Sequence, residues 1–540
     1  MLFNSYPFIF AFLPIVLIIY HLLRIYAGIK TAFGWLILAS LFFYGWWDIS
    51  YVPILLFSVI INYQLSRQIL AANSARTKTL LLTAGICGNL ALLCYFKYTI
   101  FAVSILNDVT GSSFSVSKLA LPLGISFFTF QQIIYLLDIS RGVVSVREFS
   151  RYLLFVAFFP HLIAGPILHH QEMMPQFADT PRQHAHWRNL AIGCSIFILG
   201  LAKKVLFADN LSDFVGPVHN AAAAGIPIAF FEGWMASICY ALQLYFDFSG
   251  YSDMAIGLAR MFGIILPLNF NSPYKAKNIA MFWQSWHMTL TRLLYDYVYG
   301  PLATWLTRIS ISGGYDLISR FILALAIPTV ITFFLSGLWH GAGWTFVIFG
   351  LLHAMYMVIY LAWREYRKRS RAATGGSLVG RIAAQSLTLL CVVVAFVFFR
   401  AHSVEGAIAI LKGMAGINKI SLPVSLLAYV PSLSGVLNNA GIELMGFSPN
   451  DLVGLNPTSV TLMLGLITIC LALPNTQQIF SRYRPALRPG TARWTPYRPS
   501  PGWQALTWRP SIAWGLGLGL IGLACSACLS AVSEFLYFQF

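Results

Sequence analysis

The sequence predicts an all-α polytopic membrane protein. Of its 540 residues, 58% are hydrophobic and only 10% are charged, whereas soluble domains carry about 25% charged residues. Apolar runs of about 20 residues, the length of a helix that crosses the hydrocarbon core, recur along the whole chain. We therefore expect roughly 11 to 15 membrane-inserted helices.

The apolar runs follow one another in a regular order. Candidate spans begin near residues 6, 32, 51, 79, 118, 152, 190, 227, 319, 343, 381, 459 and 511. The region 250–305 adds one or two shorter or tilted segments. No positive charge precedes the first run, which predicts a retained membrane helix rather than a cleaved secretory signal.

The positions of Lys and Arg predict the orientation. Arg24 and Lys30 follow the first span, Arg67 and Arg76 follow the third, and Lys97 alone follows the fourth. By the positive-inside rule the N-terminus lies outside, and the basic run 364–371 lies in the cytosol. The net charge of +17 thus indicates topology and contact with anionic membrane lipid, not nucleic-acid binding.

His340 is the strongest candidate for chemistry. It lies between two long apolar segments, where an ionisable side chain is costly and indicates a functional site. Histidine takes up and releases protons near neutral pH, so His340 could act as a general base. Glycines at 337, 341 and 343 can break a helix, which membrane proteins tolerate where the chain lines a cavity. The alternatives are a histidine that only hydrogen-bonds a neighbouring helix and a histidine that lies at the membrane interface with the aromatic belt.

His287 forms a second Trp-His pair, with Trp286, in a segment of mixed aromatic and polar residues. The segment is typical of a helix that lies at the interface or lines a polar cavity. Two carboxylates, Asp247 and Asp253, lie among aromatics nearby. We expect Asp253 or Ser252 to cap a helix, and a helix break at 249–250. With no acidic residue at ligand spacing, the histidines predict no metal site.

At these positions the chain resembles the membrane-bound O-acyltransferase (MBOAT) family, in particular the bacterial branch with the alginate O-acetyltransferase membrane subunit. Both Trp-His pairs carry the resemblance, together with residues 121–131, 158–167, 246–253, 268–274, 398–401 and 535–540. Gln284 and Ser285 stand where the family often has basic residues, which favours a sister subgroup that serves cellulose or another exopolysaccharide.

The resemblance implies an MBOAT-like helix bundle around a funnel, with His340 and His287 as catalytic residues. The further candidates for its substrate tunnel are Trp286, Trp339, Ser336, Asp296, Arg292 and His353. The implied reaction moves an acetyl group from cytosolic acetyl-CoA, without a bound cofactor, to an exported polysaccharide such as alginate. Periplasmic acetyltransferase partner proteins would complete the transfer at the bacterial inner membrane.

We expect one membrane domain over residues 1–540. It comprises N-terminal helices (1–118), a catalytic core (119–400), an extramembrane loop (401–458) and C-terminal helices (459–540). Two other functions stay open: a carrier for polysaccharide or lipid, and a non-catalytic scaffold of an exopolysaccharide synthase. A carrier would distribute polar residues along a pathway, whereas this chain concentrates them around the two Trp-His pairs.

Overall fold

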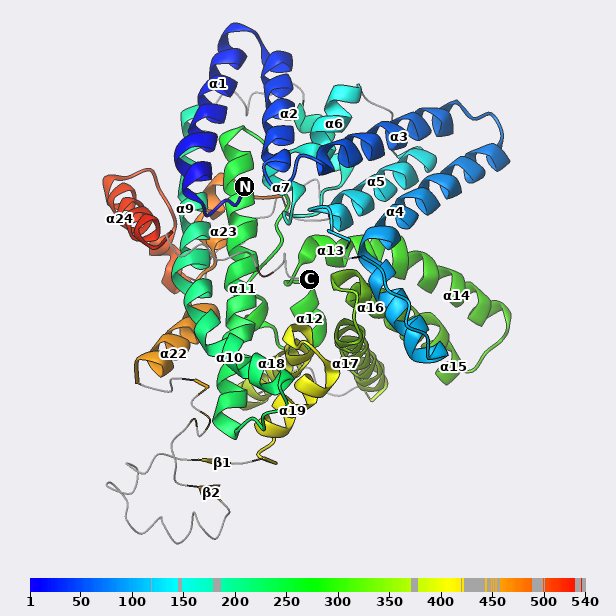
Figure 1. Cartoon of the computed structure of the whole chain (residues 1–540), viewed down its shortest axis with the longest axis vertical. Helices are drawn as coiled ribbons and strands as arrows, with labels where there is room; N and C mark the ends of the chain where they lie inside the picture. The colour runs from blue at the N-terminus through cyan, green and yellow to red at the C-terminus, as the bar shows by residue number, and fades with distance from the viewer. Residues whose placement is uncertain are drawn as a thin grey trace.

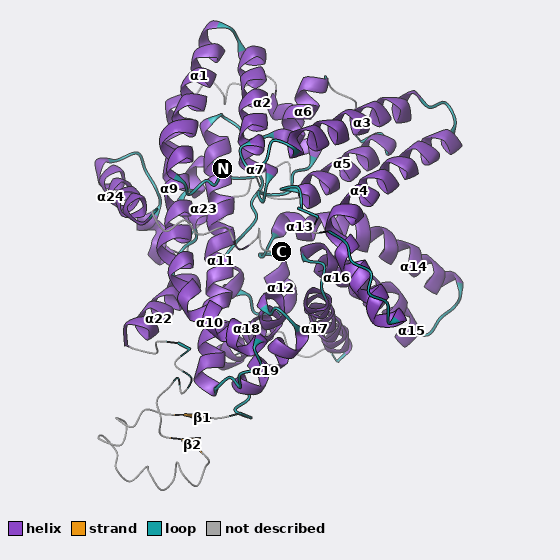
Figure 2. Ribbon diagram, in the orientation of Figure 1, coloured by secondary structure: helices purple, strands orange, loops and turns teal. Residues whose placement is uncertain are grey.

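The protein is described by a computed structural model. It describes residues 1–117, 119–143, 148–177, 186–370, 377–418, 420–421, 442–443, 448, 450, 452–453, 457–487, 499, 501–529 and 536. Within these residues the structure is almost entirely helical (Figure 1, Figure 2). The strands β1 (Ile420–Ser421) and β2 (Ile442–Glu443) form one short parallel pair. The all-α prediction is confirmed.

Seven helical segments of the described chain are long and apolar enough to cross a membrane. They are Pro7–Tyr26, Tyr51–Ala71, Ala75–Thr110, His186–Ala223, Leu317–His340, Trp344–Arg369 and Leu378–Arg400. Four shorter apolar helices, α2 (Ile29–Gly45), α5 (Ile125–Ser140), α22 (Pro457–Ala472) and α24 (Ile512–Cys528), bring the candidates to the lower end of the predicted range.

The N-terminal half begins with helices that pack as neighbours in sequence order. Its elements are η1 (Pro7–Phe12), α1 (Leu13–Tyr26), α2, α3 (Tyr51–Ala71), α4 (Ala75–Thr110), α5, α6 (Phe149–Ala157), α7 (Phe159–Leu162), α8 (His170–Met173) and η2 (Met174–Phe177). Lys97 was expected after the end of the fourth span. It lies inside α4 instead, because this helix continues to Thr110.

The middle of the chain is organised around one long helix, α11 (Phe230–Met261), which is buried along most of its length. Four elements precede it: α9 (His186–Ala202), the π-helix η3 (Lys203–Ala208), η4 (Asp209–Leu211) and α10 (Ser212–Ala223). In Figure 1, α9 and α10 follow one another along the side of α11, and each packs against it.

Short helices follow α11 before the next long pair. They are η5 (Pro273–Lys275), α12 (Ile279–Trp283), α13 (Met288–Leu294), η6 (Tyr295–Tyr299), α14 (Gly300–Ser312), α15 (Leu317–Phe321) and η7 (Ile322–Ala326). The chain then continues through α16 (Ile327–His340), α17 (Trp344–Arg369), α18 (Leu378–Arg400) and α19 (Val404–Met414). The remaining elements are α22, α23 (Thr476–Ile479), η8 (Ser481–Tyr483), η9 (Pro501–Leu506) and α24.

Glycines let α9 and α11 approach closely. A Cβ atom at Gly200 would lie 2.7 Å from the Gly250 carbonyl oxygen, and one at Gly193 would lie 2.6 Å from the Gly257 oxygen. Small residues at such contacts are typical of helix packing in membranes. The expected helix break at residues 249–250 is therefore wrong: α11 continues through Gly250, which serves close packing.

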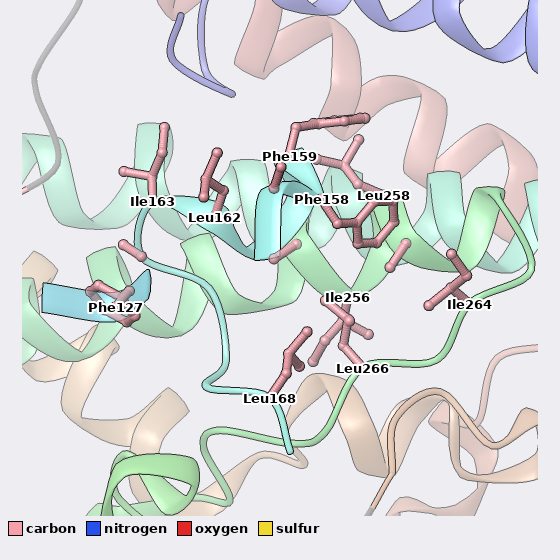
Figure 3. Packing of buried hydrophobic residues seen from close by; sticks show 14 of the residues in the cluster. Phe127, Phe158, Phe159, Leu162, Ile163, Leu168, Ile256, Leu258, Ile264 and Leu266 are labelled. Atoms are coloured by element: carbon pink, nitrogen blue, oxygen red, sulfur yellow. The ribbon is translucent and has the colours of Figure 1, made fainter. Parts of the chain in front are cut away.

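The buried cluster in Figure 3 shows how α11 is joined to the N-terminal half. Phe158 and Phe159 at the start of α7 are fully buried, as are Leu258 of α11 and Ile264 just beyond it. These side chains meet in one hydrophobic core. This core positions the loop after α11, and that loop forms backbone hydrogen bonds with the residues on either side of His287.

The predicted extramembrane loop at 401–458 is only partly described. Its first part forms α19, which packs against α10, α11 and α18. Most of residues 419–456 lie outside the described residues, so the division of the chain into four regions stays a prediction.

Candidate functional site

His287 occupies a break between two short helices. It is the residue before α13 and adopts a left-handed backbone conformation with φ of 43° and ψ of 52°. Backbone hydrogen bonds from Asn271 to Ser285 and from Met288 to Asn269 hold the break against the loop after α11. A non-glycine residue with positive φ persists only where its surroundings enforce it, and such residues cluster at functional sites.

The side chain of Asn269 fixes the protonation of the His287 ring. Asn269 Oδ1 accepts hydrogen bonds from the Thr289 hydroxyl at 2.9 Å and the Thr289 backbone N–H at 3.4 Å. Because an N–H only donates, this atom is the amide oxygen. His287 Nδ1, at 3.0 Å from the same oxygen, must therefore carry the proton. Nε2 then holds the lone pair of the neutral imidazole.

That lone pair is held in a dry environment. His287 is 1% exposed, and Nε2 has no hydrogen-bond partner among the residues that the structure describes. The ring lies edge-on to Phe248 at a centroid distance of 4.8 Å. A buried polar atom without a partner is expensive and requires an explanation, which a substrate donor at Nε2 would supply.

His340 is the last residue of α16. Gly341 and Gly343, both in extended conformation, turn the chain into α17. Gly337 does not break the helix as expected; it lies within α16, where an added Cβ would collide with the backbone of Phe346. Gly350 meets α16 in the same way, so the two helices approach closely enough for α17 to face His340.

Trp339 connects the two histidines. Its ring centroid lies 4.9 Å from that of His340 and 6.0 Å from that of His287. His340, which is 7% exposed, also contacts Phe399 of α18 at 5.1 Å. The structure thus brings both Trp-His histidines to one buried aromatic cluster, although they are 53 positions apart in the chain.

His353 borders the same cluster. Phe349 contacts both His353, at 4.7 Å, and His340, at 6.0 Å. The Trp283 indole N–H donates to His353 Nδ1 at 3.3 Å, so the proton of a neutral His353 is on Nε2.

Two further candidates for the tunnel are buried as well. Ser336 lies one turn before His340 on α16. Trp286 stacks on Phe282 at 5.5 Å and completes the aromatic wall.

Arg292 and Asp296 belong to a different polar cluster. Arg292 pairs with Glu172 at 2.5 Å and, through Nε, with Asp296 at 3.4 Å. Nearby, the Tyr297 hydroxyl donates to Asp138 at 2.8 Å. The element η6, which carries Asp296 and Tyr297, packs against α16. That Arg292 and Asp296 line the same tunnel as the histidines stays a prediction.

An open pocket of about 450 Å³ lies beside this cluster. Its lining consists of Arg141, Tyr295, Asp296, Gly300, Pro301, Thr304, Trp305 and Arg308. Two guanidinium groups and two large aromatic rings in one pocket can bind phosphate and stack on a flat ring system.

Asp247 and Asp253 do not act as a pair. Asp253 was expected to cap a helix, but it lies within α11 and pairs with Lys203 at 2.6 Å. Asp247 pairs with Lys204 at 2.7 Å. Sequence reasoning missed both lysines; two cations next to each other in an apolar run are the signal that could have indicated them.

Metal ligands do not gather in the described part of the chain: no group there has three or more His, Cys, Asp or Glu side chains that could hold a metal ion.

Both a protein-family model and individual known proteins match this chain. The family model of the membrane-bound O-acyltransferases matches residues 77–379, a segment that contains His287, His340 and His353. A peptidoglycan O-acetyltransferase of Helicobacter pylori is 41% identical over 449 residues, which cover 78% of this chain and 81% of that protein.

Two further relatives differ in the substrates that their names state. A probable alginate O-acetylase AlgI of Azotobacter vinelandii is 36% identical over 75% of this chain and 76% of its own. A teichoic acid D-alanyltransferase of Bacillus subtilis is 30% identical over 46% of this chain and 60% of its own.

Proposed function

The chain belongs to the membrane-bound O-acyltransferase family, and from that premise we propose that it transfers an acetyl group from acetyl-CoA to a hydroxyl of an extracytoplasmic glycan. The observation that carries the proposal is the pair of buried histidines around Trp339. It is an O-acyltransferase with several apolar helices long enough to cross a membrane. We place it in the bacterial inner membrane, where a cytosolic donor and an exported acceptor meet.

His340 acts as the general base. It takes the proton of the acceptor hydroxyl as that oxygen attacks the thioester carbonyl carbon. The new C–O bond forms, the C–S bond breaks, and the same proton passes from His340 to the leaving thiolate. The aromatic walls of Trp339, Phe349 and Phe399 exclude water, so the thioester is not hydrolysed.

His287 orients a substrate through its free lone pair. With Nδ1–H engaged by Asn269, Nε2 can accept a hydrogen bond but cannot donate one. It therefore binds an O–H of the acceptor or an amide N–H of the pantetheine arm, and not the thioester oxygen. In this role His287 selects the orientation of the reacting groups.

The pocket beside η6 would hold the charged part of the donor. Arg141 and Arg308 suit its phosphates, while Tyr295 and Trp305 offer flat surfaces for the adenine ring. Arg141 follows α5 on the side that the positive-inside rule assigns to the cytosol. Acetyl-CoA is present on that side of the inner membrane.

We expect Arg308→Ala to raise the KM for acetyl-CoA about tenfold or more and to leave kcat nearly unchanged, because one charge-assisted hydrogen bond is lost. Steady-state kinetics of the purified protein in proteoliposomes measures both values. Arg381→Ala, an exposed arginine at the start of α18, is the control and should keep the wild-type KM. A normal KM in the Arg308 variant would exclude the pocket as the donor site.

Two glycans are candidates for the acceptor. The Helicobacter pylori relative favours peptidoglycan, and the alginate relatives favour an exported polysaccharide. In either case the immediate acceptor can be a periplasmic acetyltransferase partner protein that completes the transfer. Both routes need a hydroxyl nucleophile at the same histidines.

The decisive experiment measures base-labile acetate in two fractions, peptidoglycan and exopolysaccharide, from a deletion strain with and without the wild-type gene. Loss of acetate from one fraction on deletion, with restoration on complementation, identifies the acceptor. Acceptor-dependent release of CoA thiol by the purified protein separates an enzyme from a carrier or a scaffold. Unchanged acetate in both fractions together with no thiol release would refute the proposal.

A further inference from the structure

The C-terminal end of α16 presents carbonyl groups that its own helix does not satisfy. The last carbonyl oxygens of a helix lack internal partners and need donors from elsewhere. Here two adjacent residues of α4 supply them. Lys97 Nζ donates to the Trp339 oxygen at 2.5 Å and to the His340 oxygen at 3.2 Å, and the Tyr98 hydroxyl donates to the Leu338 oxygen at 2.8 Å.

The helix end, rather than an acid, holds the Lys97 ammonium. Among the residues that the structure describes, no carboxylate lies within ion-pair distance of Lys97. The C-terminus of a helix carries a partial negative charge, which favours a cation. A charged group within an apolar helix such as α4 is costly unless it has such a role.

The hydrogen bonds of Lys97 lie directly at the candidate catalytic residue. The two carbonyl groups that accept hydrogen bonds from Lys97 belong to His340 itself and to Trp339, whose ring contacts both histidines. Directly after them, Gly341 leaves helical geometry. Without Lys97 the carbonyl groups of Trp339 and His340 would lose this donor, while the Leu338 carbonyl would keep its hydrogen bond from Tyr98.

Resting on the proposed function of His340, we propose that Lys97 is a positioning residue for His340. Lys97 anchors the last turn of α16 from α4 and thereby fixes the position of the imidazole against Trp339 and Phe399. It touches no reacting atom. Its effect is on the rate of the chemical step, because misplacing a catalytic group by about 1 Å can reduce the rate about 100-fold.

The test compares three variants in proteoliposomes. Lys97→Met removes the charge and its hydrogen bonds at similar length, Lys97→Arg keeps them, and Lys78→Met near the start of the same helix is the matched control. We measure kcat, KM for acetyl-CoA and thermal unfolding. A second readout is the rate at which diethyl pyrocarbonate modifies His340, followed on its peptide by mass spectrometry.

We expect Lys97→Met to lower kcat per folded molecule about 100-fold with little change in KM, and to raise the modification rate of His340 several-fold as the last turn loosens. Lys97→Arg should recover at least a tenth of the wild-type kcat, and Lys78→Met should match the wild type. A wild-type kcat and modification rate in Lys97→Met would overturn the inference.

The two readouts separate this inference from the proposed function. An inactive wild type would refute acetyl transfer, while the modification rate would still test whether Lys97 holds His340. An unchanged rate in Lys97→Met would then overturn the inference. An active wild type with an equally active Lys97→Met would leave the function standing and remove Lys97 from it. A purely structural role would lower the unfolding temperature without changing kcat per folded molecule.

Discussion

Replacing His340 by alanine is expected to abolish acetyl transfer while the protein still inserts and folds. Loss of a general base typically reduces a rate about 10²- to 10⁴-fold. The ring that is removed also fills space between Trp339 and Phe399, so water would enter the reacting position. Both effects act on the chemical step, and we expect residual activity below the detection limit of an acetate assay.

The measurement is base-labile acetate in the acceptor glycan of a deletion strain that expresses each variant, with membrane abundance checked by immunoblot. His219→Ala is the matched control, because His219 is also buried and, among the described residues, its ring hydrogen-bonds the Val215 carbonyl of its own helix. His287→Ala should also lose acetylation. Full restoration by His340→Ala would exclude the catalytic assignment and favour a carrier or a scaffold.

Replacing Lys204 by methionine is expected to give the largest loss of stability. Lys204 lies between Asp247 at 2.7 Å and Asp209 at 2.8 Å, and the side chains of Lys204 and Asp247 are each only 2% exposed. Removing one partner of a buried ion pair leaves an uncompensated charge and destabilises by about 3–5 kcal/mol. Thermal unfolding in detergent should show a clearly lower transition temperature and a reduced yield.

Lys203→Met is the matched comparison. Its partner Asp253 keeps hydrogen bonds from the Thr476 hydroxyl at 2.7 Å and the Gln477 amide at 3.0 Å, so the loss should be smaller. The double variant Lys204→Met, Asp247→Asn should recover much of the lost stability, because it removes the more deeply buried of the two carboxylates that Lys204 compensates. Equal unfolding temperatures for Lys204→Met and the wild type would contradict a role of this pair in stability.

Much of the fold could be predicted from the sequence because membrane insertion depends on local composition. Predicted spans near residues 51, 343 and 511 correspond to helices that begin at Tyr51, Trp344 and Ile512. Predictions about glycine were less accurate. Gly250 and Gly337 were expected to break helices, but each lies within one. The sequence does not distinguish a glycine that packs against another helix from a glycine that ends a helix.

The candidate site was predicted in part. His340, His287, Trp339, Trp286 and His353 lie around one aromatic cluster. The family resemblance implied this proximity of the two histidines, and the catalytic roles of these residues stay a prediction. Arg292 and Asp296 form a separate cluster with Glu172. Asn269, which sets the tautomer of His287, was missed because an asparagine in a loop carries no signal of its partner.

The class of the protein follows from local properties of the amino-acid sequence: apolar runs of spanning length, few charges, and two histidines where charge is costly. These properties belong to short segments and depend on the transfer of each segment into the membrane. Which groups surround the histidines follows instead from how the helices pack. Lys97 reaches the Trp339 carbonyl across 242 positions of sequence, and Lys204 finds Asp247 on another helix. Such contacts arise from the packing of whole helices, where a buried charge is stable only beside the group that compensates it.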